Sequence, residues 1–495
     1  MCRSDTLSGL ATALMLLVSI IDTADAHITP SRATPAGNTP FTKTAAYLNG
    51  QTIDLTLSDA IYLGLRDNRV IRSAYLDRVS QKFDLRVAED QFTPKLILSG
   101  SYISTRNQTD RSRQASTAQA STLLTPYGTR VSLGWAYQHT QANKAGLLRN
   151  DGANITVIQP LLRGAGREVA TAPVKMAQLN EQINRLSLKL TVSHTITQVI
   201  SSYRELLRTQ EQLQIAGNAL ERARTLIEVN RALIAAGRMA EFEIVQTEAE
   251  LATQELAYEE SRNRLDMARL ALLQLLALDL NTQIVATDVM RAQRVDVNAA
   301  YALRQAEGSQ PAYLTELIAS EQAAVNLTVA RNNRLWDLSL VGGAAQVRDR
   351  HAFGTSRRWE NYVGLELQIP FGDLTRRQAE VQAQVRVRNQ DVALAQARQQ
   401  LELDVANALR DLGTRWRQFE IAERALALSR RKLEIEREKL GVGRSSNFQV
   451  LSFDNDLRNA ENSRLSALIA YLNAQAQLDQ SLGTTLESWG VTLND

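Results

Sequence analysis

Apolar residues recur at every seventh position along two long stretches of this chain. The first series is Val192, Val199, Leu206, Leu213, Leu220, Ile227 and Ile234. The second series is Val405, Leu412, Phe419, Leu426, Leu433 and Leu440. An apolar step of seven residues, kept over so many turns, predicts long helices packed along a left-handed supercoil. We expect the first long helix over about 167–236, a length of about 105 Å at 1.5 Å per residue.

Each series ends at a turn of similar sequence, which contains Gly-Arg and then a Phe five residues after the Gly. The two turns occupy positions 237–245 and 443–451. Gly is the usual residue where a helix ends in the left-handed conformation. We therefore predict that each turn is the tip of a helical hairpin, with Phe242 and Phe448 packed inside the hairpin.

Between the helical stretches, apolar and polar residues alternate with a period of two, which is typical of strands. In the second half, Leu365 and Leu367 alternate with Glu366 and Gln368. The first half contains three strand-like segments, and its Ser-, Thr- and Gln-rich positions have the composition of a mobile loop. The strand-like segments are 95–105, 130–140 and 153–160, and the loop is 106–127.

The strands before the long helix must cross the membrane an even number of times, because only then does the chain come back to the side on which the helices lie. We therefore keep the first and last of these segments as strands and assign 130–140 to an extended outer loop. This leaves four strands per chain. Four strands cannot close into a barrel, and an open sheet edge is not tolerated in lipid. A membrane barrel would therefore require several chains.

The same elements occur twice in the same order, with Pro and Gly landmarks at matching places, as expected for an internal duplication. We predict a first structural repeat over 54–285, consisting of a helix, a strand pair within 94–162, a long helix, a tip and a return helix. The second repeat, 286–485, has the same parts, with its strand pair within 336–371.

The two ends of the chain lie outside the predicted repeats and have other sequence features. Residues 1–26 have the basic start, apolar run and A-x-A motif of a secretory signal peptide. The apolar run is shorter than the ~20 residues that a membrane-spanning helix needs, which argues against an anchor. Residues 27–53 are predicted to be an N-terminal arm, and 486–495 a C-terminal tail. Cys2 is the only cysteine, so no disulfide is possible within one chain.

The sequence offers no catalytic constellation, and we expect neither an enzyme nor a bound cofactor or metal. The four histidines lie far apart without the spacing of metal ligands. They are His27, His139, His194 and His351. The formal charge of +3 is spread over mixed Arg and Glu, without a basic block, so a nucleic-acid partner is not expected.

Taken in order, three landmarks of the chain resemble the TolC-like outer-membrane efflux protein family. They are the Leu-Ser-Asp-Ala-Ile segment at 57–61, the Ile-Gln-Pro-Leu-Leu-Arg-Gly segment at 158–164, and the two Gly-Arg-x-x-x-Phe tips. The resemblance implies a mainly α fold with a transmembrane β-barrel part: a homotrimer with a 12-stranded barrel in the outer membrane of a Gram-negative bacterium and a periplasmic helical tunnel. It also implies a periplasmic membrane-fusion adaptor that docks on the tips, and an inner-membrane pump of the RND or ABC type.

The resemblance assigns roles to particular positions. The docking tips are Gly237, Arg238, Met239, Gly443, Arg444 and Ser445. The periplasmic entrance comprises Glu243, Gln449, Ser452 and Asp456, and the barrel lumen Glu366 and Gln368. Entrances in the family are commonly acidic, and Gln449 and Ser452 depart from that pattern. Asp456 lies on the same helix face, where it either narrows the entrance or belongs to a solvated surface.

The function implied is an exit duct that passes substrates from an inner-membrane pump and its adaptor to the exterior. The alternative is a periplasmic coiled-coil adaptor or scaffold without a pore. An adaptor is expected to carry small soluble β-domains beside one hairpin, whereas this chain has duplicated amphipathic strands. The duplication therefore favours the duct.

Overall fold

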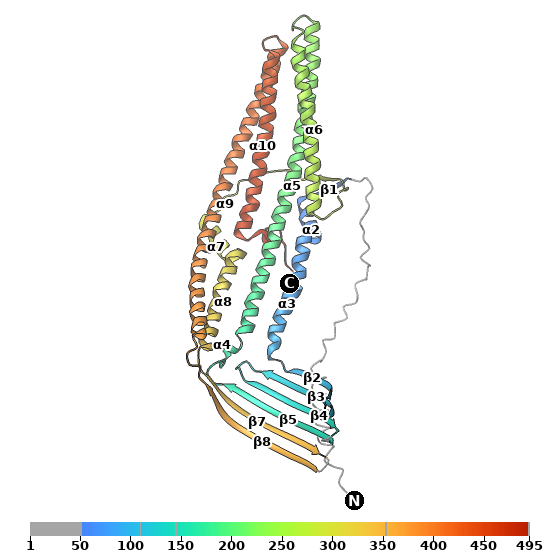
Figure 1. The fold of residues 1–495 in the computed structure, drawn as a ribbon. Coiled ribbons are helices and arrows are strands. Elements are labelled where there is room, and N and C mark those ends of the chain that lie inside the picture. Colours follow the sequence, from blue (N-terminus) through green and yellow to red (C-terminus); the bar gives the residue numbers. More distant parts are fainter. Residues whose placement is uncertain (1–51, 109, 144–145, 352–353, 494–495) are drawn as a thin grey trace. The chain divides into compact units, whose positions relative to one another are not determined.

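The computed structural model describes residues 52–108, 110–143, 146–351 and 354–493. They form a set of long helices, one six-stranded sheet and one two-stranded sheet (Figure 1). The predicted signal peptide, 1–26, lies outside the described residues, as do 27–51 of the predicted arm and 494–495 of the predicted tail.

The first half of the described chain contains four strands between two sets of helices. In order, its elements are β1 (Ile53–Leu55), α2 (Leu57–Asp67), α3 (Arg69–Glu89), η1 (Asp90–Phe92), β2 (Lys95–Arg106), β3 (Arg111–Leu124), β4 (Arg130–Ala142), β5 (Gly146–Pro160), α4 (Arg167–Ala170), α5 (Ala172–Ala235) and α6 (Glu243–Leu275). Thr56 caps α2, because its hydroxyl accepts the Asp59 N–H at 3.2 Å while the Asp59 carboxylate accepts the Thr56 N–H at 3.3 Å.

The second half repeats this order of elements with fewer strands. Its elements are β6 (Ile284–Ala286), α7 (Ala299–Ser309), α8 (Pro311–Asn333), β7 (Asp337–His351), β8 (Gly354–Gln368), α9 (Thr375–Gly441), α10 (Asn447–Leu482) and α11 (Thr485–Ser488). The long helices are of similar length, with 64 residues in α5 and 67 in α9. In both halves a pair of shorter helices precedes the strands, and a long helix, a turn and a return helix follow them.

The seven-residue apolar series lies on the packing faces of α5 and α9. Val192, Val199 and Leu206 of α5 are at most 1% exposed, and Val405 and Leu412 of α9 are 3% and 4% exposed. The return helices cover these faces: α6 lies along α5, and α10 lies between α9 and α5 (Figure 1). One apolar stripe thus holds each hairpin together and joins the two hairpins.

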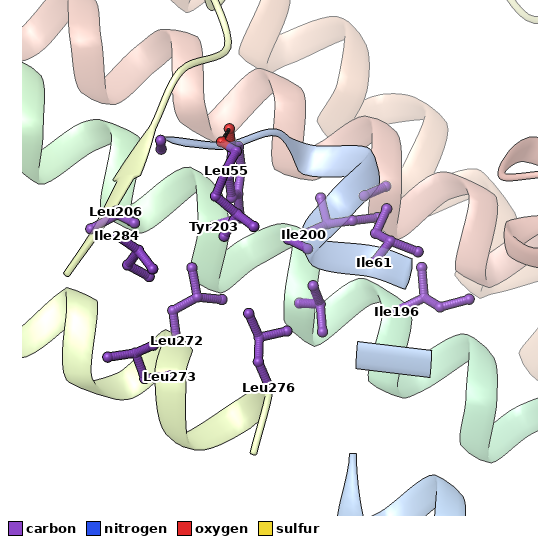
Figure 2. Close-up of a cluster of buried hydrophobic side chains, with 14 of the residues drawn as sticks. Leu55, Ile61, Ile196, Ile200, Tyr203, Leu206, Leu272, Leu273, Leu276 and Ile284 are labelled. Atoms are coloured by element: carbon purple, nitrogen blue, oxygen red, sulfur yellow. Dashed lines mark hydrogen bonds between the residues drawn. The ribbon is translucent and has the colours of Figure 1, made fainter. Parts of the chain in front are cut away.

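Tyr203 is the centre of the largest buried cluster (Figure 2). It is 0% exposed, and its hydroxyl oxygen lies 2.8 Å from both the Leu55 carbonyl oxygen and the Asp288 carboxylate. The same carboxylate accepts the Leu57 N–H at 2.6 Å. Since β1 also pairs in parallel with β6, the start of the first half and the link to the second half meet on α5.

The main sheet has the strand order β2-β3-β4-β5-β7-β8, and every neighbouring pair is antiparallel. The prediction of four strands is therefore wrong. Most of the segment 106–127 forms β3, and the segment 130–140 lies within β4. The number of strands of this sheet before α5 is still even, because β3 and β4 are added as a pair. They form a hairpin, so the chain begins and ends this pair at the same end of the sheet.

The register gives the sheet one apolar face and one polar face. Directly paired residues share a face, so one face carries Leu98 of β2, Trp135 of β4, Ile155 of β5, Leu340 of β7 and Leu365 of β8. All five are exposed, between 38% and 72%. We call this the apolar face.

The opposite face, which we call the polar face, carries mainly small and polar residues. They include Ser132, Asn154, Thr156, Ser339 and Tyr362. Tyr362 lies across Gly343, where an added Cβ would come within 2.6 Å of the ring. The lower exposure of this face in β4, β5 and β7 identifies it as the concave side of the curved sheet.

Strand β3 differs from its neighbours because it is polar on both faces. On the apolar face its Gln119 is paired with Leu98 on one side and Trp135 on the other. Apolar neighbours on both sides thus flank the glutamine. This lack of alternation explains why the sequence pattern did not reveal the strand.

The turn between β3 and β4 is fixed against the joint between β5 and α4. Gly128 is buried with a φ of +90°, and a Cβ added to it would lie 2.4 Å from the carbonyl oxygen of Gly164. Next to it, the Thr129 hydroxyl donates to the Gln159 side-chain carbonyl at 2.5 Å. The additional hairpin is therefore held at its helix-side end by a backbone contact that only glycine permits.

We predict that Gly128→Ala destabilises the protein more than Gly146→Ala. Both glycines have a positive φ, and a Cβ in that conformation costs about 1–2 kcal/mol. Only Gly128 adds a clash with backbone, which costs about a further 1–3 kcal/mol; a Cβ at Gly146 meets no described atom within 4 Å. Thermal unfolding of the purified protein in detergent measures the difference, and equal losses in the two variants would contradict the contact.

Candidate functional site

The turn between α5 and α6 ends the helix at Gly237, which has a φ of +70°. The Gly237 N–H donates to the Ile234 carbonyl at 2.9 Å, and the Arg238 N–H donates to the Leu233 carbonyl at 2.8 Å. This pair of bonds is a Schellman motif, in which the residue after the helix cap is left-handed. The motif satisfies two carbonyls that would otherwise lack a partner at the helix end.

The turn between α9 and α10 has the same geometry. Gly443 has a φ of +74°, its N–H donates to the Leu440 carbonyl at 3.0 Å, and the Arg444 N–H donates to the Lys439 carbonyl at 2.8 Å. The two tips lie close together, since the guanidinium of Arg238 is 3.8 Å from the position that a Cβ on Gly443 would take. The duplicated sequence thus produces duplicated tips at the same end of the helices (Figure 1).

The prediction that the tip phenylalanines pack inside the hairpins is wrong. Phe242 is 76% exposed and Phe448 is 67% exposed. Each lies at the start of its return helix, and the apolar contact is instead made by Met239, which packs against a buried cluster of the second hairpin. The cluster consists of Leu433, Leu440, Val450 and Leu457. Both tips therefore present an aromatic ring to solvent.

A buried polar cluster joins three helices just below the tips. Asn230 of α5, Thr247 of α6 and Asn447 of α10 are at most 1% exposed. The Asn230 side-chain amide donates to Thr247 at 2.7 Å and to Asn447 at 3.0 Å, and the Asn447 amide donates to Thr247 at 2.9 Å. The apolar pattern of the sequence did not reveal this cluster, although a signal was present. Asn230 lies three residues after Ile227 of the seven-residue series, at a position where a coiled-coil seam is usually apolar.

An ion-pair triad lies two turns further from the tips. Asp454 of α10 accepts from Arg222 of α5 at 2.6 Å and lies 3.3 Å from Arg437 of α9. Arg222 and Asp454 are both less than a fifth exposed, so water screens this pair less than a surface pair. The triad connects the two hairpins through α10.

Three of the predicted entrance residues, Gln449, Ser452 and Asp456, lie exposed on α10. The Asp456 carboxylate accepts from Lys432 of α9 at 2.9 Å, so it is paired across its own hairpin. Glu243 begins α6 and is half-buried, and its backbone carbonyl accepts from the Asn447 amide at 3.4 Å. The structure thus brings Glu243 to the buried polar cluster, apart from the exposed face of the other three.

Ser445 connects the second tip to a buried carboxylate. Its hydroxyl donates to Glu436 Oε1 at 2.6 Å, and Lys439 Nζ lies 3.2 Å from Glu436 Oε2. These two bonds, first that of Ser445 and then that of Lys439, hold the pKa of Glu436 below its ordinary value. The tip is therefore fastened to α9 by an ionised glutamate.

Glu366 and Gln368 lie on the polar face of the sheet at its helix-side end. There they line a cavity of about 440 Å³ together with Arg130, Arg163 and Asp337. Arg163 forms an ion pair with Asp337, and this pair ties the joint after β5 to the start of β7. The described residues contain no cluster of His, Cys, Asp or Glu suited to a metal ion. Among the helices of residues 52–493, none combines the length and apolar character required to cross a membrane.

Residues 302–484 match the model of the outer membrane efflux protein family. This segment is an outer membrane efflux domain. The family resemblance inferred from the sequence is thereby confirmed. The matched region extends from α7 to the end of α10 and so contains the whole second hairpin and the strands β7 and β8. No curated protein matches the chain by sequence.

The fold of the chain is shared with solved outer-membrane channels. The channel CusC matches with 18% identity and a TM-score of 0.67 over 87% of this chain and 93% of CusC. CmeC of Campylobacter jejuni matches with 16% identity and a TM-score of 0.65 over 87% of this chain and 86% of CmeC. MtrE of Neisseria gonorrhoeae, solved in an open state, matches with 16% identity and a TM-score of 0.65 over 87% of this chain and 89% of MtrE. The outer membrane efflux domain thus lies within a chain that has the fold of these channels.

We predict that Ser445→Ala weakens the pH dependence of the second tip in this domain. Because the folded-state pKa of Glu436 is lowered, its stabilising contribution is present above the ordinary glutamate pKa of about 4.3 and is lost as the pH falls through the folded-state value. Amide hydrogen exchange at positions 436–447, compared between neutral pH and about pH 3.5, measures this loss. Ser452→Ala, at an exposed position, serves as the control and should follow the wild type.

Without the Ser445 hydroxyl, ionised Glu436 should stabilise the second tip less. Acid should therefore increase the rate of amide hydrogen exchange less in Ser445→Ala than in the wild type. The same acid-induced change in Ser445→Ala and the wild type would contradict a role for this bond.

Proposed function

We propose that three copies of this chain form the outer-membrane exit duct of a tripartite efflux or type I secretion system in a Gram-negative bacterium. The observation that carries the proposal is the six-stranded sheet, which has an apolar face, a polar face and two unpaired edges. Strands of 12 to 15 residues exceed the ~9–11 residues that a tilted transmembrane strand needs.

In this arrangement the apolar face contacts lipid and the concave polar face lines the lumen. Glu366 and Gln368 then face the lumen, and Leu365 and Leu367 face the acyl chains. Tyr102, Trp135, Tyr137 and Trp359 follow the aliphatic positions along the apolar face, as aromatic girdles do at the membrane interface.

The edges of the sheet are compatible with closure between copies. Strands β2 and β8 are exposed along their whole length, and an even number of alternating strands gives the two edges opposite directions. Strand β8 of one copy can therefore pair antiparallel with β2 of the next. With six strands per chain, a trimer closes at eighteen strands instead of the twelve that the family resemblance implies. For a strand spacing of about 4.8 Å and a tilt of about 40°, the backbone diameter rises from about 24 Å to about 36 Å.

At the other end of the helices, the tips provide a surface for a periplasmic membrane-fusion adaptor. Phe242 and Phe448 offer exposed aromatic rings, and Arg444 offers a guanidinium that bonds carbonyls or carboxylates of a partner. Interfaces concentrate their binding energy in such aromatic and arginine side chains. An inner-membrane pump of the RND or ABC type would then supply the substrate, and α10, with Gln449, Ser452 and Asp456, would border the entrance.

The same proposal assigns a role to each segment of the chain. Residues 1–26 direct export, 27–53 form an arm on the mature protein, and 486–495 form a tail. The duplicated repeats 54–285 and 286–485 each contribute one hairpin to the tunnel.

We predict that Leu365→Arg prevents assembly in the outer membrane and that Glu366→Arg does not. An arginine that faces lipid near the midplane costs about 2–4 kcal/mol, whereas an arginine in the lumen stays hydrated. Heat-modifiable migration of the protein from the outer-membrane fraction measures assembly. The pair Leu133→Arg and Ser132→Arg applies the same comparison to β4, the strand that the sequence pattern assigned to a loop.

If both members of each pair assemble equally well, the assignment of faces is wrong. If the difference appears at Leu365 and is absent at Leu133, β4 lies outside the barrel and the eighteen-stranded closure fails.

We predict that Arg444→Glu leaves the trimer intact but abolishes export and crosslinking to the adaptor. A charge at an exposed tip contributes little to folding, so its reversal acts on the partner. Export of a pump substrate, adaptor crosslinking and the level of trimer in the membrane are measured together. Arg424→Glu, on the exposed side of α9 about 30 Å from the tip, is the matched control. Normal export with normal crosslinking in Arg444→Glu would remove this arginine from the docking surface.

A further inference from the structure

Four arginines form two directly opposed pairs on the apolar face of the sheet. Arg149 of β5 pairs with Arg350 of β7, and Arg348 of β7 pairs with Arg357 of β8. Side chains in such pairs have Cβ atoms about 4.5–5.5 Å apart, and like charges at that distance repel. Two adjacent like-charge pairs need a compensating anion.

The protein provides little compensation on this face. Within the two rows of paired residues, Asp151 is the one carboxylate, and His139, Tyr137 and Thr355 are the other neighbours. Four positive charges and one negative charge leave an excess of three. Asp349, although adjacent in sequence, lies on the polar face, where it pairs with Arg358 at 3.4 Å.

None of the four arginines forms an ion pair or a side-chain hydrogen bond with another described residue. Closure of the barrel would not change this balance. Strand β2, the neighbour that β8 would gain from the next copy, contains no Asp or Glu. Its outer end adds Arg106, which raises the positive charge further. The compensating anion must therefore come from outside the strands.

The position of the arginines along the strands indicates which anion this is. On β7 the apolar face begins with Leu338 and Leu340 at the helix-side end and reaches Arg348 and Arg350 at the far end. On β8, Arg357 likewise lies beyond the aliphatic positions and Trp359. If the aliphatic positions contact acyl chains, the arginines lie at the level of the headgroups in the leaflet away from the periplasm. Guanidinium groups bind phosphate in a bidentate manner.

We propose that Arg149, Arg348, Arg350 and Arg357 form a site for the phosphate groups of the lipid A glycolipid in the outer leaflet. The site rests on the proposed function, since it needs the apolar face to lie in the outer membrane. The lipid supplies the negative charge that the opposed arginines lack, and its acyl chains cover the neighbouring apolar positions of β5, β7 and β8. One such site occurs in each copy of the chain.

The test compares Arg149→Gln/Arg350→Gln, Arg348→Gln/Arg357→Gln and the single variant Arg358→Gln. The last is the matched control, because Arg358 is adjacent to Arg357 but lies on the polar face. Each full-length protein is purified from outer membranes in mild detergent, and retained lipid A is counted per trimer by native mass spectrometry. We expect each double variant to retain at least about tenfold less lipid A than the wild type, because the loss of two charge-assisted hydrogen bonds exceeds the ~1.4 kcal/mol that a tenfold change in affinity represents. Arg358→Gln should match the wild type.

A second measurement does not depend on the variants. Wild-type protein stripped of lipid is mixed with bisphosphorylated lipid A, with dephosphorylated lipid A or with inorganic phosphate, and its thermal unfolding is recorded. Stabilisation by the phosphorylated lipid alone is expected. Equal stabilisation by the two lipids, or stabilisation by inorganic phosphate to the same extent, would overturn the site.

Fractionation separates failure of the site from failure of the proposed function. The lipid site alone is overturned if the wild type and the double variants form heat-modifiable trimers in the outer membrane and retain equal amounts of lipid A. A wild-type protein absent from the outer membrane overturns both.

Discussion

Every excursion of this chain into strands must return it to the end where the helices begin. Strands therefore come in pairs, and each pair adds one hairpin without disturbing the helices on either side. The first half carries two hairpins and the second half carries one, yet both continue into long helices of 64 and 67 residues. The contact between Gly128 and Gly164 shows how the additional hairpin is accommodated, because its turn lies directly against the strand-to-helix joint.

At the hairpin tips, buried residues that stabilise the fold and exposed residues available to a partner lie within a few positions of each other. Asn230, Thr247 and Asn447 hydrogen-bond to one another in a buried cluster, and a buried polar cluster of this kind favours one helix arrangement over slipped alternatives. Immediately beyond it, Phe242 and Phe448 are left in solvent. A rigid base below an exposed aromatic surface is what a docking site requires, because little conformational entropy is lost when the partner binds.

On the sheet, different types of side chain are separated along the length of the strands. On the apolar face of β7 and β8, aliphatic residues occupy the helix-side half, Trp359 follows on β8, and arginines lie towards the far end. On the polar face, two aspartates form ion pairs: Asp349 with Arg358, and Asp337 with Arg163. These two aspartates thus have partners within the protein, whereas the opposed arginines of the apolar face depend on the surroundings of the barrel.

The sequence alone determined the features that rest on local periodicity: the long helices, the tips ended by Gly237 and Gly443, the alternation in β8 and the family resemblance. Tertiary structure decided what periodicity does not encode. Strand β3 is polar on both faces, so its place in the sheet depends on hydrogen bonds to β2 and β4. At the first tip, Met239 makes the apolar contact with the second hairpin and Phe242 is left exposed, which the similar sequences of the two tips do not reveal. Arg149 and Arg350 lie 201 positions apart in the sequence, and they are opposed only through the register of β5 and β7, which exists once the strands have paired.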